Sequence, residues 1–168
     1  MFDLARDSNG ALYLATGPEA KVWRLGPADE SPVEILAHER EQIFAVAVVN
    51  TALLVAVSGD GTTRLERIVG DTSQVICTLP DTRYIWDVTV ADGHAYLATG
   101  SDGKIFRVDL AREGPDALRE VFDATQSNIL CLGMDAAGVL YAGTDDGGLL
   151  FRIDLGEDGT ARTFVLYD

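Results

Sequence analysis

The sequence predicts an all-β fold made of four repeats, and three observations support this. Short apolar runs alternate with turn pairs such as Asp92-Gly93, whose residues tolerate the positive φ that tight hairpins require. The same order of runs and turns begins four times, at Met1, Ile43, Ile85 and Ile129, which are 42, 42 and 44 residues apart. No segment shows a helical period. Four short strands in a period of this length are typical of a β-propeller blade.

The third repeat shows the elements most clearly. Its apolar runs predict four antiparallel strands, at Ile85 to Val90, Ala95 to Ala98, Ile105 to Val108 and Leu118 to Phe122. The runs are separated by the turns Asp92-Gly93 and Ser101-Asp102-Gly103 and by a looser segment. Each repeat is therefore expected to form one four-stranded sheet.

The other repeats give the same order of elements. In the first repeat we expect strands at Phe2 to Ala5, Leu12 to Thr16, Val22 to Leu25 and Val33 to Leu36. In the second and fourth we expect, among others, Ile43 to Val49, Thr63 to Ile68, Gln74 to Leu79, Ile129 to Leu132 and Arg162 to Leu166. The predicted blades span about residues 1–42, 43–84, 85–128 and 129–168, in one propeller domain or half-propeller.

Composition limits the partners. The 168 residues carry a formal net charge of −14, so a nucleic-acid backbone or an anionic membrane would repel the chain as a whole. The strongly apolar stretch Ile43 to Val57 is shorter than the roughly 20 residues of a spanning helix. We see no signal peptide or transmembrane segment, so as it stands the chain reads as cytoplasmic, with no nucleic-acid or membrane partner.

The ends of the repeat array predict self-association. The first strands are nearly continuous in apolar residues, which is typical of strands buried on both faces, so we place them innermost in each blade. The chain starts and ends at repeat boundaries, so its two end blades would present bare apolar faces. Four blades can close a small ring, but we favour two copies that join head to tail as an eight-bladed homodimer. The chain also resembles a piece of a longer array.

The two cysteines occupy different places in their repeats. Cys77 lies in a predicted fourth strand and Cys131 in a first strand. We expect two buried free thiols instead of a disulfide, and no metal site, since neither spacing nor a nearby histidine supports one.

The repeats resemble those of bacterial β-propellers in the broad WD40-like and two-component-regulator-propeller group. The resemblance rests on units such as LYAGTDDGGLLFRID, at Leu140 to Asp154, and it covers the whole chain. The Trp86-Asp87 pair lies in a first strand, so it is not the WD dipeptide of WD40 repeats. The resemblance implies a propeller fold and implies little about activity.

Four residues are the candidate ligand-binding positions of a central channel: Asp3, Asp87, Trp86 and Tyr84. Asp3 and Asp87 hold the same place in their first strands, where they could bind a cation or a basic ligand, because charge on an innermost strand is costly unless paired or solvated. The alternative, which we prefer, is that they accept backbone N–H bonds or lie in channel water. Trp86 and Tyr84 could stack on a ligand at the channel mouth or simply pack between blades.

One arginine recurs at the same point of every third strand. These residues are Arg24, Arg67, Arg107 and Arg152. Because they belong to four separate blades, we expect them to form cross-strand pairs with polar partners such as Glu34 and Glu120, and not an anion site.

No catalytic constellation is recognisable. The histidines, His38 and His94, have no third partner at a recognisable spacing, and no GxSxG motif is present. We therefore predict a non-enzymatic binding scaffold, or a fragment of a longer propeller, that needs no cofactor and binds a protein or a small ligand. The alternative is a lactonase-like propeller hydrolase with a divalent cation in its channel. Stabilisation by Ca²⁺ in a thermal melt would distinguish the two.

Overall fold

The computed structural model describes residues 1–17, 19–59, 61–156 and 161–167. It contains four separate sheets, each of four antiparallel strands that follow one another in chain order. The first sheet consists of β1 (Asp3–Arg6), β2 (Leu12–Thr16), β3 (Lys21–Leu25) and β4 (Val33–Ala37). The second consists of β5 (Glu41–Val49), β6 (Ala52–Gly59), β7 (Thr63–Val69) and β8 (Thr72–Leu79). The predicted strands of these two repeats are confirmed.

The second half of the chain repeats this plan. The third sheet consists of β9 (Tyr84–Ala91), β10 (His94–Gly100), β11 (Lys104–Asp109) and β12 (Leu118–Asp123). The fourth consists of β13 (Ile129–Met134), β14 (Leu140–Thr144), β15 (Leu150–Leu155) and β16 (Ala161–Tyr167). Two short 3-10 segments, η1 (Gly114–Ala117) and η2 (Asp146–Gly148), lie in connections. No helix in the described ranges is long and apolar enough to cross a membrane.

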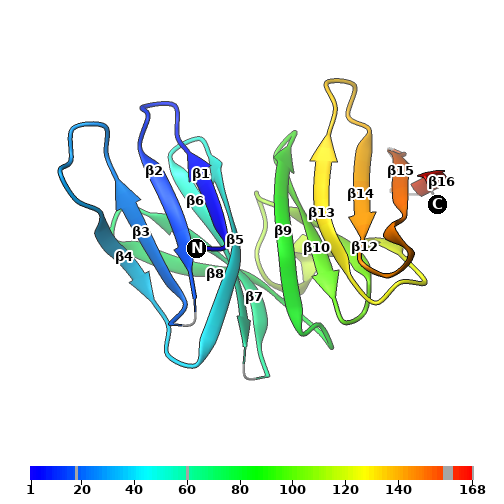
Figure 1. Cartoon of the computed structure of the whole chain (residues 1–168), viewed down its shortest axis with the longest axis horizontal. Coiled ribbons are helices and arrows are strands. Elements are labelled where there is room, and N and C mark those ends of the chain that lie inside the picture. The colour runs from blue at the N-terminus through cyan, green and yellow to red at the C-terminus, as the bar shows by residue number, and fades with distance from the viewer. Residues whose placement is uncertain (18, 60, 157–160, 168) are drawn as a thin grey trace.

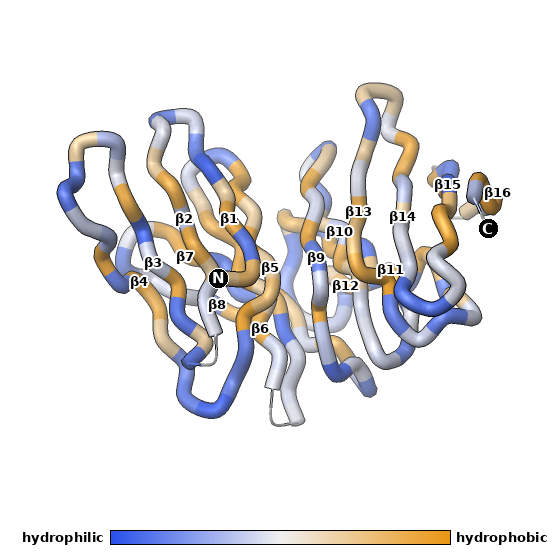
Figure 2. Tube along the Cα trace, in the orientation of Figure 1, coloured by the Kyte–Doolittle hydropathy of each residue, from blue (hydrophilic) through white to orange (hydrophobic). Residues whose placement is uncertain are grey.

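The four sheets are the blades of an open arc (Figure 1). Blade 1 lies at one end of the view and blade 4 at the other, so the chain does not close a four-bladed ring on its own. The first strands β1, β5, β9 and β13 follow one another along the arc, and each contacts the next. We call the contact surfaces between successive blades joint 1–2, joint 2–3 and joint 3–4. Figure 2 shows hydrophobic residues along the strands and hydrophilic residues in many of the connections at their ends.

Each joint has its own apolar core. Joint 1–2 buries Ala15 and Val22 of blade 1 against Val46 and Val55 of blade 2. Because side chains alternate along a strand, the other face of blade 2 meets blade 3 in a core that includes Leu54, Leu65, Leu97 and Phe106. The arc is thus held together by three successive apolar layers.

The most buried strands are not the innermost ones. Six of the eight residues of β6 and six of the seven residues of β10 are buried. In β13, by contrast, only Ile129 is buried. The expectation that the first strands are buried on both faces is therefore wrong for β1 and β13, because among the described residues each packs against a neighbouring blade on one face only. For the same reason Cys131 is exposed, which corrects the prediction of two buried thiols, whereas Cys77 is buried.

Two β-bulges recur from blade to blade. On the third strand the register with the fourth strand shifts after Val22, Leu65, Ile105 and Leu150. On the first strand the shift leaves Phe44, Trp86 and Leu130 without a partner on the second strand. Bulges re-aim side chains, so the first-strand bulge sets the direction of two residues of the candidate site described below, Phe44 and Trp86.

Candidate functional site

Asp3 and Asp87 link successive blades through the backbone. Asp3 accepts the N–H of Val46 at 2.8 Å, and Asp87 accepts the N–H of Leu132 at 2.7 Å. The other carboxylate oxygen of each accepts the N–H of the next residue, at 2.7 Å in both cases. Each carboxylate therefore satisfies a donor of the following blade, which is the second of the two roles considered for it. We call these contacts the aspartate links.

The aspartate links satisfy each carboxylate with backbone donors. Burial raises the pKa of the Asp87 carboxyl, against the lowering effect of its two backbone hydrogen bonds. Within the part of the chain that the structure describes, no group of three or more His, Cys, Asp or Glu side chains is placed to hold a metal ion. Both oxygens of each aspartate accept a backbone hydrogen bond, which stabilises the charged carboxylate without a cation.

Trp86 and Tyr84 belong to a larger aromatic group. The ring centroids of Phe2 and Phe44 are 4.8 Å apart, and those of Phe44 and Trp86 are 4.7 Å apart. Tyr84 lies 4.9 Å from Trp86 and 5.9 Å from Phe44. These separations are typical of favourable tilted or edge-to-face pairs. We call Phe2, Phe44, Tyr84 and Trp86 the aromatic row; it runs across three blades.

The position of the row follows from local backbone geometry. Phe44 and Trp86 are the unpaired bulge residues of their first strands, so their side chains leave the usual alternation. Gly17 makes room for the ring of Phe2, and Gly100 for the ring of Trp86. An added Cβ would lie 2.3 Å from the ring of Phe2 at Gly17 and 2.4 Å from the indole nitrogen of Trp86 at Gly100. The indole N–H of Trp86 also donates to Asn128 at 2.9 Å, which fixes the orientation of its ring.

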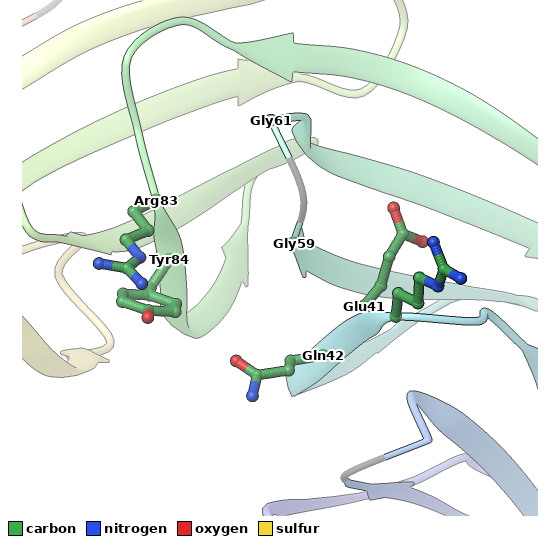
Figure 3. A pocket seen from close by; sticks show the side chains of 7 residues that line it. Glu41, Gln42, Gly59, Gly61, Arg83 and Tyr84 are labelled. Carbon is green, nitrogen blue, oxygen red and sulfur yellow. The ribbon is translucent and has the colours of Figure 1, made fainter.

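A pocket of about 470 Å³ opens beside Tyr84. It is lined by Arg40, Glu41, Gln42, Gly59, Gly61, Arg83 and Tyr84. Figure 3 shows Arg83 and Tyr84 on one side of the pocket and Glu41 on the other. The pocket therefore lies between the start of β5, the β6–β7 hairpin and the start of β9, next to the aromatic row.

Two arginines give the pocket a local positive charge in an acidic chain. The guanidinium of Arg83 lies 5.1 Å from the centroid of the Tyr84 ring, within the range of a cation–π contact. Arg40 has a φ of +62°, a left-handed conformation that is uncommon for a residue with a side chain. In the described ranges neither arginine forms an ion pair, whereas Glu41 does. A ligand with a carboxylate and an apolar or aromatic group would match this surface.

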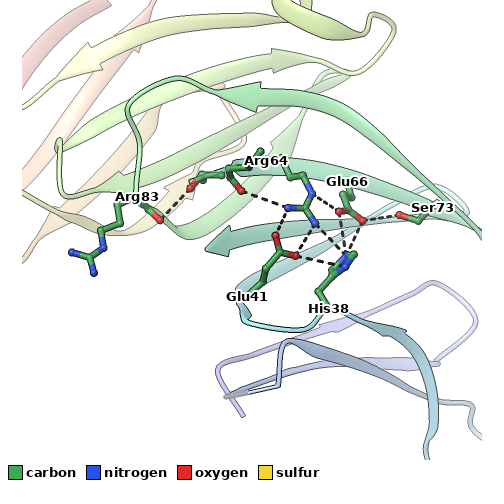
Figure 4. Close-up of polar contacts among 8 residues, drawn as sticks. His38, Glu41, Arg64, Glu66, Ser73 and Arg83 are labelled. Carbon is green, nitrogen blue, oxygen red and sulfur yellow. Dashed lines mark hydrogen bonds and ion pairs between the residues drawn. The ribbon is translucent and has the colours of Figure 1, made fainter. Parts of the chain in front are cut away.

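A network of charged side chains adjoins the pocket and shares Glu41 with it (Figure 4). Arg64 binds both oxygens of Glu41, at 2.6 and 2.8 Å, and donates to Glu66 at 2.6 Å. Ser73 donates to Glu66 at 2.7 Å, and His38 lies 3.2 Å from the same carboxylate. The network ties the connection between blades 1 and 2 to the body of blade 2, and so it holds Arg40 and Glu41 at the pocket.

Ionisation of the network is favoured. The hydrogen bond from Arg64 lowers the pKa of Glu41. Burial alone would raise the pKa of Glu66, but the hydrogen bonds from Ser73 and Arg64 outweigh it, and the pKa is lowered. The two carboxylates in turn raise the pKa of Arg64. Arg64, Glu41 and Glu66 are therefore all charged at neutral pH.

Glu66 occupies a position that is aromatic in the other blades. Strand register places it where blades 1, 3 and 4 have Trp23, Phe106 and Phe151, since each lies opposite the matching residue of the second strand. Its side chain is nevertheless almost completely buried. A buried carboxylate in place of an apolar ring is costly unless it is paired, so the cation of Arg64 is required here.

The recurring third-strand arginines do not pair as predicted. Arg24 contacts Asp29 at 3.4 Å and Arg152 contacts Asp154 at 2.9 Å, while Glu34 and Glu120 bind the lysines Lys21 and Lys104. The reason is the third-strand bulge, which places Glu34 opposite Trp23 and Glu120 opposite Phe106 instead of opposite the arginines. Arg67 instead donates across joint 2–3 to the carbonyl of Leu110, at 2.5 Å.

A second hollow of about 640 Å³ lies at the outer rim of joint 2–3, between β8 and η1. Its walls are mainly apolar and include Val75, Ile76, Pro115 and Leu118. Burial raises the pKa of the neighbouring Cys77 thiol to about 11, so this cysteine is unreactive at neutral pH.

Sequence reasoning found only part of this site. It named Tyr84 and Trp86, which the structure brings together, and Asp3 and Asp87, which lie instead in the links between blades. It missed the pocket arginines, Arg40 and Arg83, because both lie in connections whose path is set by tertiary contacts. The aromatic residue near the start of three first strands was the available signal for the row.

Comparisons with known proteins agree with the fold. No family model and no curated protein matches the sequence. Among solved structures, a chain of a mitotic checkpoint complex matches with a TM-score of 0.74 at 13% identity, over 98% of this chain and 51% of that chain. YCF48 bound to a D1 peptide matches with a TM-score of 0.69 at 13% identity, over 98% and 54%.

A chain of a nidogen/laminin complex matches with a TM-score of 0.68 at 15% identity, over 94% of this chain and 60% of that chain. The chain thus spans about half to three-fifths of the length of these similar structures. Similarity at such low identity shows the fold alone. The chain has the fold of part of a β-propeller.

Proposed function

We propose that this chain is a non-enzymatic binding module that holds an extended segment of a protein partner at the inner ends of its blades. The observation that carries the proposal is the contiguity of the aromatic row with a pocket that presents Arg40 and Arg83. Rings give large contact area at low entropic cost, and arginines are preferred partners of carboxylates. Tyrosine, tryptophan and arginine are also the residues enriched at binding hot spots.

The segment that fits this surface has an apolar or aromatic side chain followed closely by a carboxylate. The apolar side chain would lie against Trp86 and Tyr84, and the carboxylate would bind Arg83 or Arg40. The similar propeller chains occur in a mitotic checkpoint complex, in a nidogen/laminin complex and with a bound peptide, which supports a protein or peptide ligand. The half-length match also supports a role as part of a larger propeller.

A selection from a phage-displayed random-peptide library on the immobilised whole chain tests the proposal. We expect enriched peptides that combine an aromatic or apolar residue with an acidic one. Calorimetric titration of a synthetic copy should show binding weakened about tenfold or more by Arg83→Ala and by Tyr84→Ala, since each removes about 1.4 kcal/mol or more.

The matched control is Arg112→Ala. Arg112 is an exposed arginine of blade 3 that pairs with Asp109, away from the pocket, so its removal should leave the affinity unchanged. Circular dichroism of each variant confirms that the sheets persist. A library that yields no enriched peptide, or peptides that bind all variants equally, would refute the proposed site.

A further inference from the structure

The two ends of the arc expose apolar surfaces made of different residues. At the blade 4 end, Leu150, Leu166 and Tyr167 have exposed fractions of 39, 52 and 69%. At the blade 1 end, Leu4 has an exposed fraction of 46%, and Leu14 and Trp23 share its face by strand register. We call these surfaces the trailing face (Leu150, Leu166, Tyr167, with Cys131) and the leading face (Leu4, Leu14, Trp23).

The trailing face matches the surface of blade 2 that is covered by blade 3. Strand register and the recurring bulge place Leu150, Leu166 and Tyr167 where blade 2 has Leu65, Ile76 and Cys77. Those three residues of blade 2 have exposed fractions of 0, 1 and 1%. The same positions are thus core residues where a blade follows and exposed where none does.

The leading face matches the surface of blade 3 that covers blade 2. Leu4, Leu14 and Trp23 correspond in register to Val88, Leu97 and Phe106, which are all buried in joint 2–3. Blades 1 and 3 also share the pentapeptide YLATG and the aspartate of the aspartate links. Blade 1 therefore presents the same kind of surface that blade 2 accepts within the chain.

Polar positions agree with this match. In joint 2–3 Arg67 donates to a carbonyl of blade 3, and Arg152 holds the same position in blade 4. Blade 2 has Ala45 where an aspartate link would begin, and blade 4 has Cys131 at that position. A joint between blade 4 and a following blade 1 would therefore resemble joint 2–3, which lacks an aspartate link, and not the two linked joints.

We propose that the trailing face of one chain docks on the leading face of a second copy, and that two such joints close an eight-bladed ring. Each contact is heterologous, and the pair has two-fold symmetry because both joints are equivalent. Each new joint would have the same arrangement of residues as joint 2–3, which the chain already forms internally. Closure also brings the partner subunit's Phe2 to Leu130, the aliphatic residue that holds the bulge position of Phe44 and Trp86 in blade 4. The inference does not depend on the proposed peptide ligand.

Light scattering behind a sizing column gives the first test. We expect 36.0 kDa, twice the 18.0 kDa of one chain, and no larger species as concentration rises. A mass of 18.0 kDa, or a mass that keeps increasing with concentration as in an open chain of copies, would overturn the ring.

Two variants then test which faces meet. Leu166→Glu places a charge on the trailing face and Leu4→Glu on the leading face; both residues are exposed in the single chain, so neither change is expected to prevent folding. Each variant alone should be monomeric. An equimolar mixture should recover the 36.0 kDa species, because one joint stays intact between an unaltered trailing face and an unaltered leading face.

Thiol labelling gives an independent readout. Cys131 should be protected from a thiol reagent in the wild-type dimer and should react in either monomeric variant, while the buried Cys77 stays silent in both. If one variant remains dimeric alone, or the mixture stays monomeric, like faces pair or other surfaces are used, and the head-to-tail joint is wrong. Peptide binding is measured separately, so its failure and the failure of the ring are distinguishable.

Discussion

Joints 1–2 and 2–3 are held by different chemistry, although they join blades of the same design. Joint 1–2 contains an aspartate link, in which Asp3 accepts the N–H of Val46, and a partly buried charge network centred on Arg64. Among the described residues joint 2–3 shows neither. It contains a larger apolar core, a side chain to backbone bond from Arg67, and a buried hydrogen bond from the Ile85 N–H to the Ser58 hydroxyl.

The difference teaches that the structural unit of the chain is a pair of blades. The aspartate link recurs in joint 3–4 through Asp87, so linked and unlinked joints alternate along the arc. Within a pair, an aspartate of one first strand accepts a backbone N–H of the next first strand. Between blades 2 and 3 the contact is a larger apolar core with hydrogen bonds from Arg67 and to Ser58, and apolar burial is a type of contact that a separate copy can also make.

The largest effect is expected from breaking the charge network of joint 1–2. Arg64→Ala leaves the buried Glu66 without its cation, so the free energy of unfolding should fall by about 3–5 kcal/mol. Urea denaturation measures the loss. The matched control is Lys104→Ala, at the same position of blade 3, where the pair with Glu120 is exposed and the midpoint should hardly move. Equal losses in both variants would show that burial of the network is unimportant.

A core residue of joint 2–3 should come next. Leu97 is fully buried, and Leu97→Ala should cost about 2–5 kcal/mol through lost transfer energy and the cavity left behind. Leu14 holds the same position on the leading face. In a Leu166→Glu background, where no partner covers that face, Leu14→Ala should cost clearly less in the same urea titration. A cost as large as that of Leu97→Ala would mean that the leading face is covered within the single chain.

An aspartate link should contribute less to the free energy of unfolding than the charge network or the core residue Leu97. Asp87→Ala removes the acceptor of two N–H groups, those of Val88 and Leu132, and should cost about 1–3 kcal/mol. Hydrogen exchange followed by NMR should show faster exchange of the Leu132 amide in the variant. Unchanged exchange would indicate that this bond does not hold blade 4 to blade 3.

The smallest effect is expected in the pH dependence of the free energy of unfolding, to which the charge network and the aspartate link contribute with opposite signs. The lowered pKa values of Glu41 and Glu66 stabilise the fold above their ordinary value of 4.5, and this contribution is lost as pH falls through the lowered values. The raised pKa of Asp87 has the opposite sign, since its contribution is lost as pH rises through the raised value. The stability difference between wild type and Arg64→Ala should therefore narrow below about pH 4.5. A difference that stays constant with pH would contradict the network's assigned role.

The fold could be predicted because its signals are local. Apolar runs, Asp-Gly turns and a period in the forties specify strands and hairpins without long-range information; the turn Asp92-Gly93, for example, has positive φ at both residues, as expected. Bulges do not leave such a signal. The third-strand bulge places Glu34 opposite Trp23 instead of Arg24. The first-strand bulge takes Phe44 and Trp86 out of the usual alternation of side chains.

The candidate site was less predictable for the same reason. Alignment of the repeats shows that Glu66 replaces an aromatic residue, but its partner His38 lies 28 residues away in a connection. Only the folded chain brings these residues together. The exposure of β13 could not be read from its apolar sequence either, because burial there depends on whether another blade packs against that face.

A crosslinking measurement tests the central claim, that the two ends of the arc are complementary, most directly. In joint 2–3 Ala45 and Val88 belong to one core, and Cys131 and Leu4 hold the corresponding places at the two ends. In a Leu4→Cys variant assembled under reducing conditions and then exposed to a mild oxidant, the account predicts a disulfide-linked dimer between the new thiol of one copy and Cys131 of the other. The dimer should disappear when Cys131→Ala is added. Absence of the crosslink, or its persistence without Cys131, would contradict the head-to-tail ring.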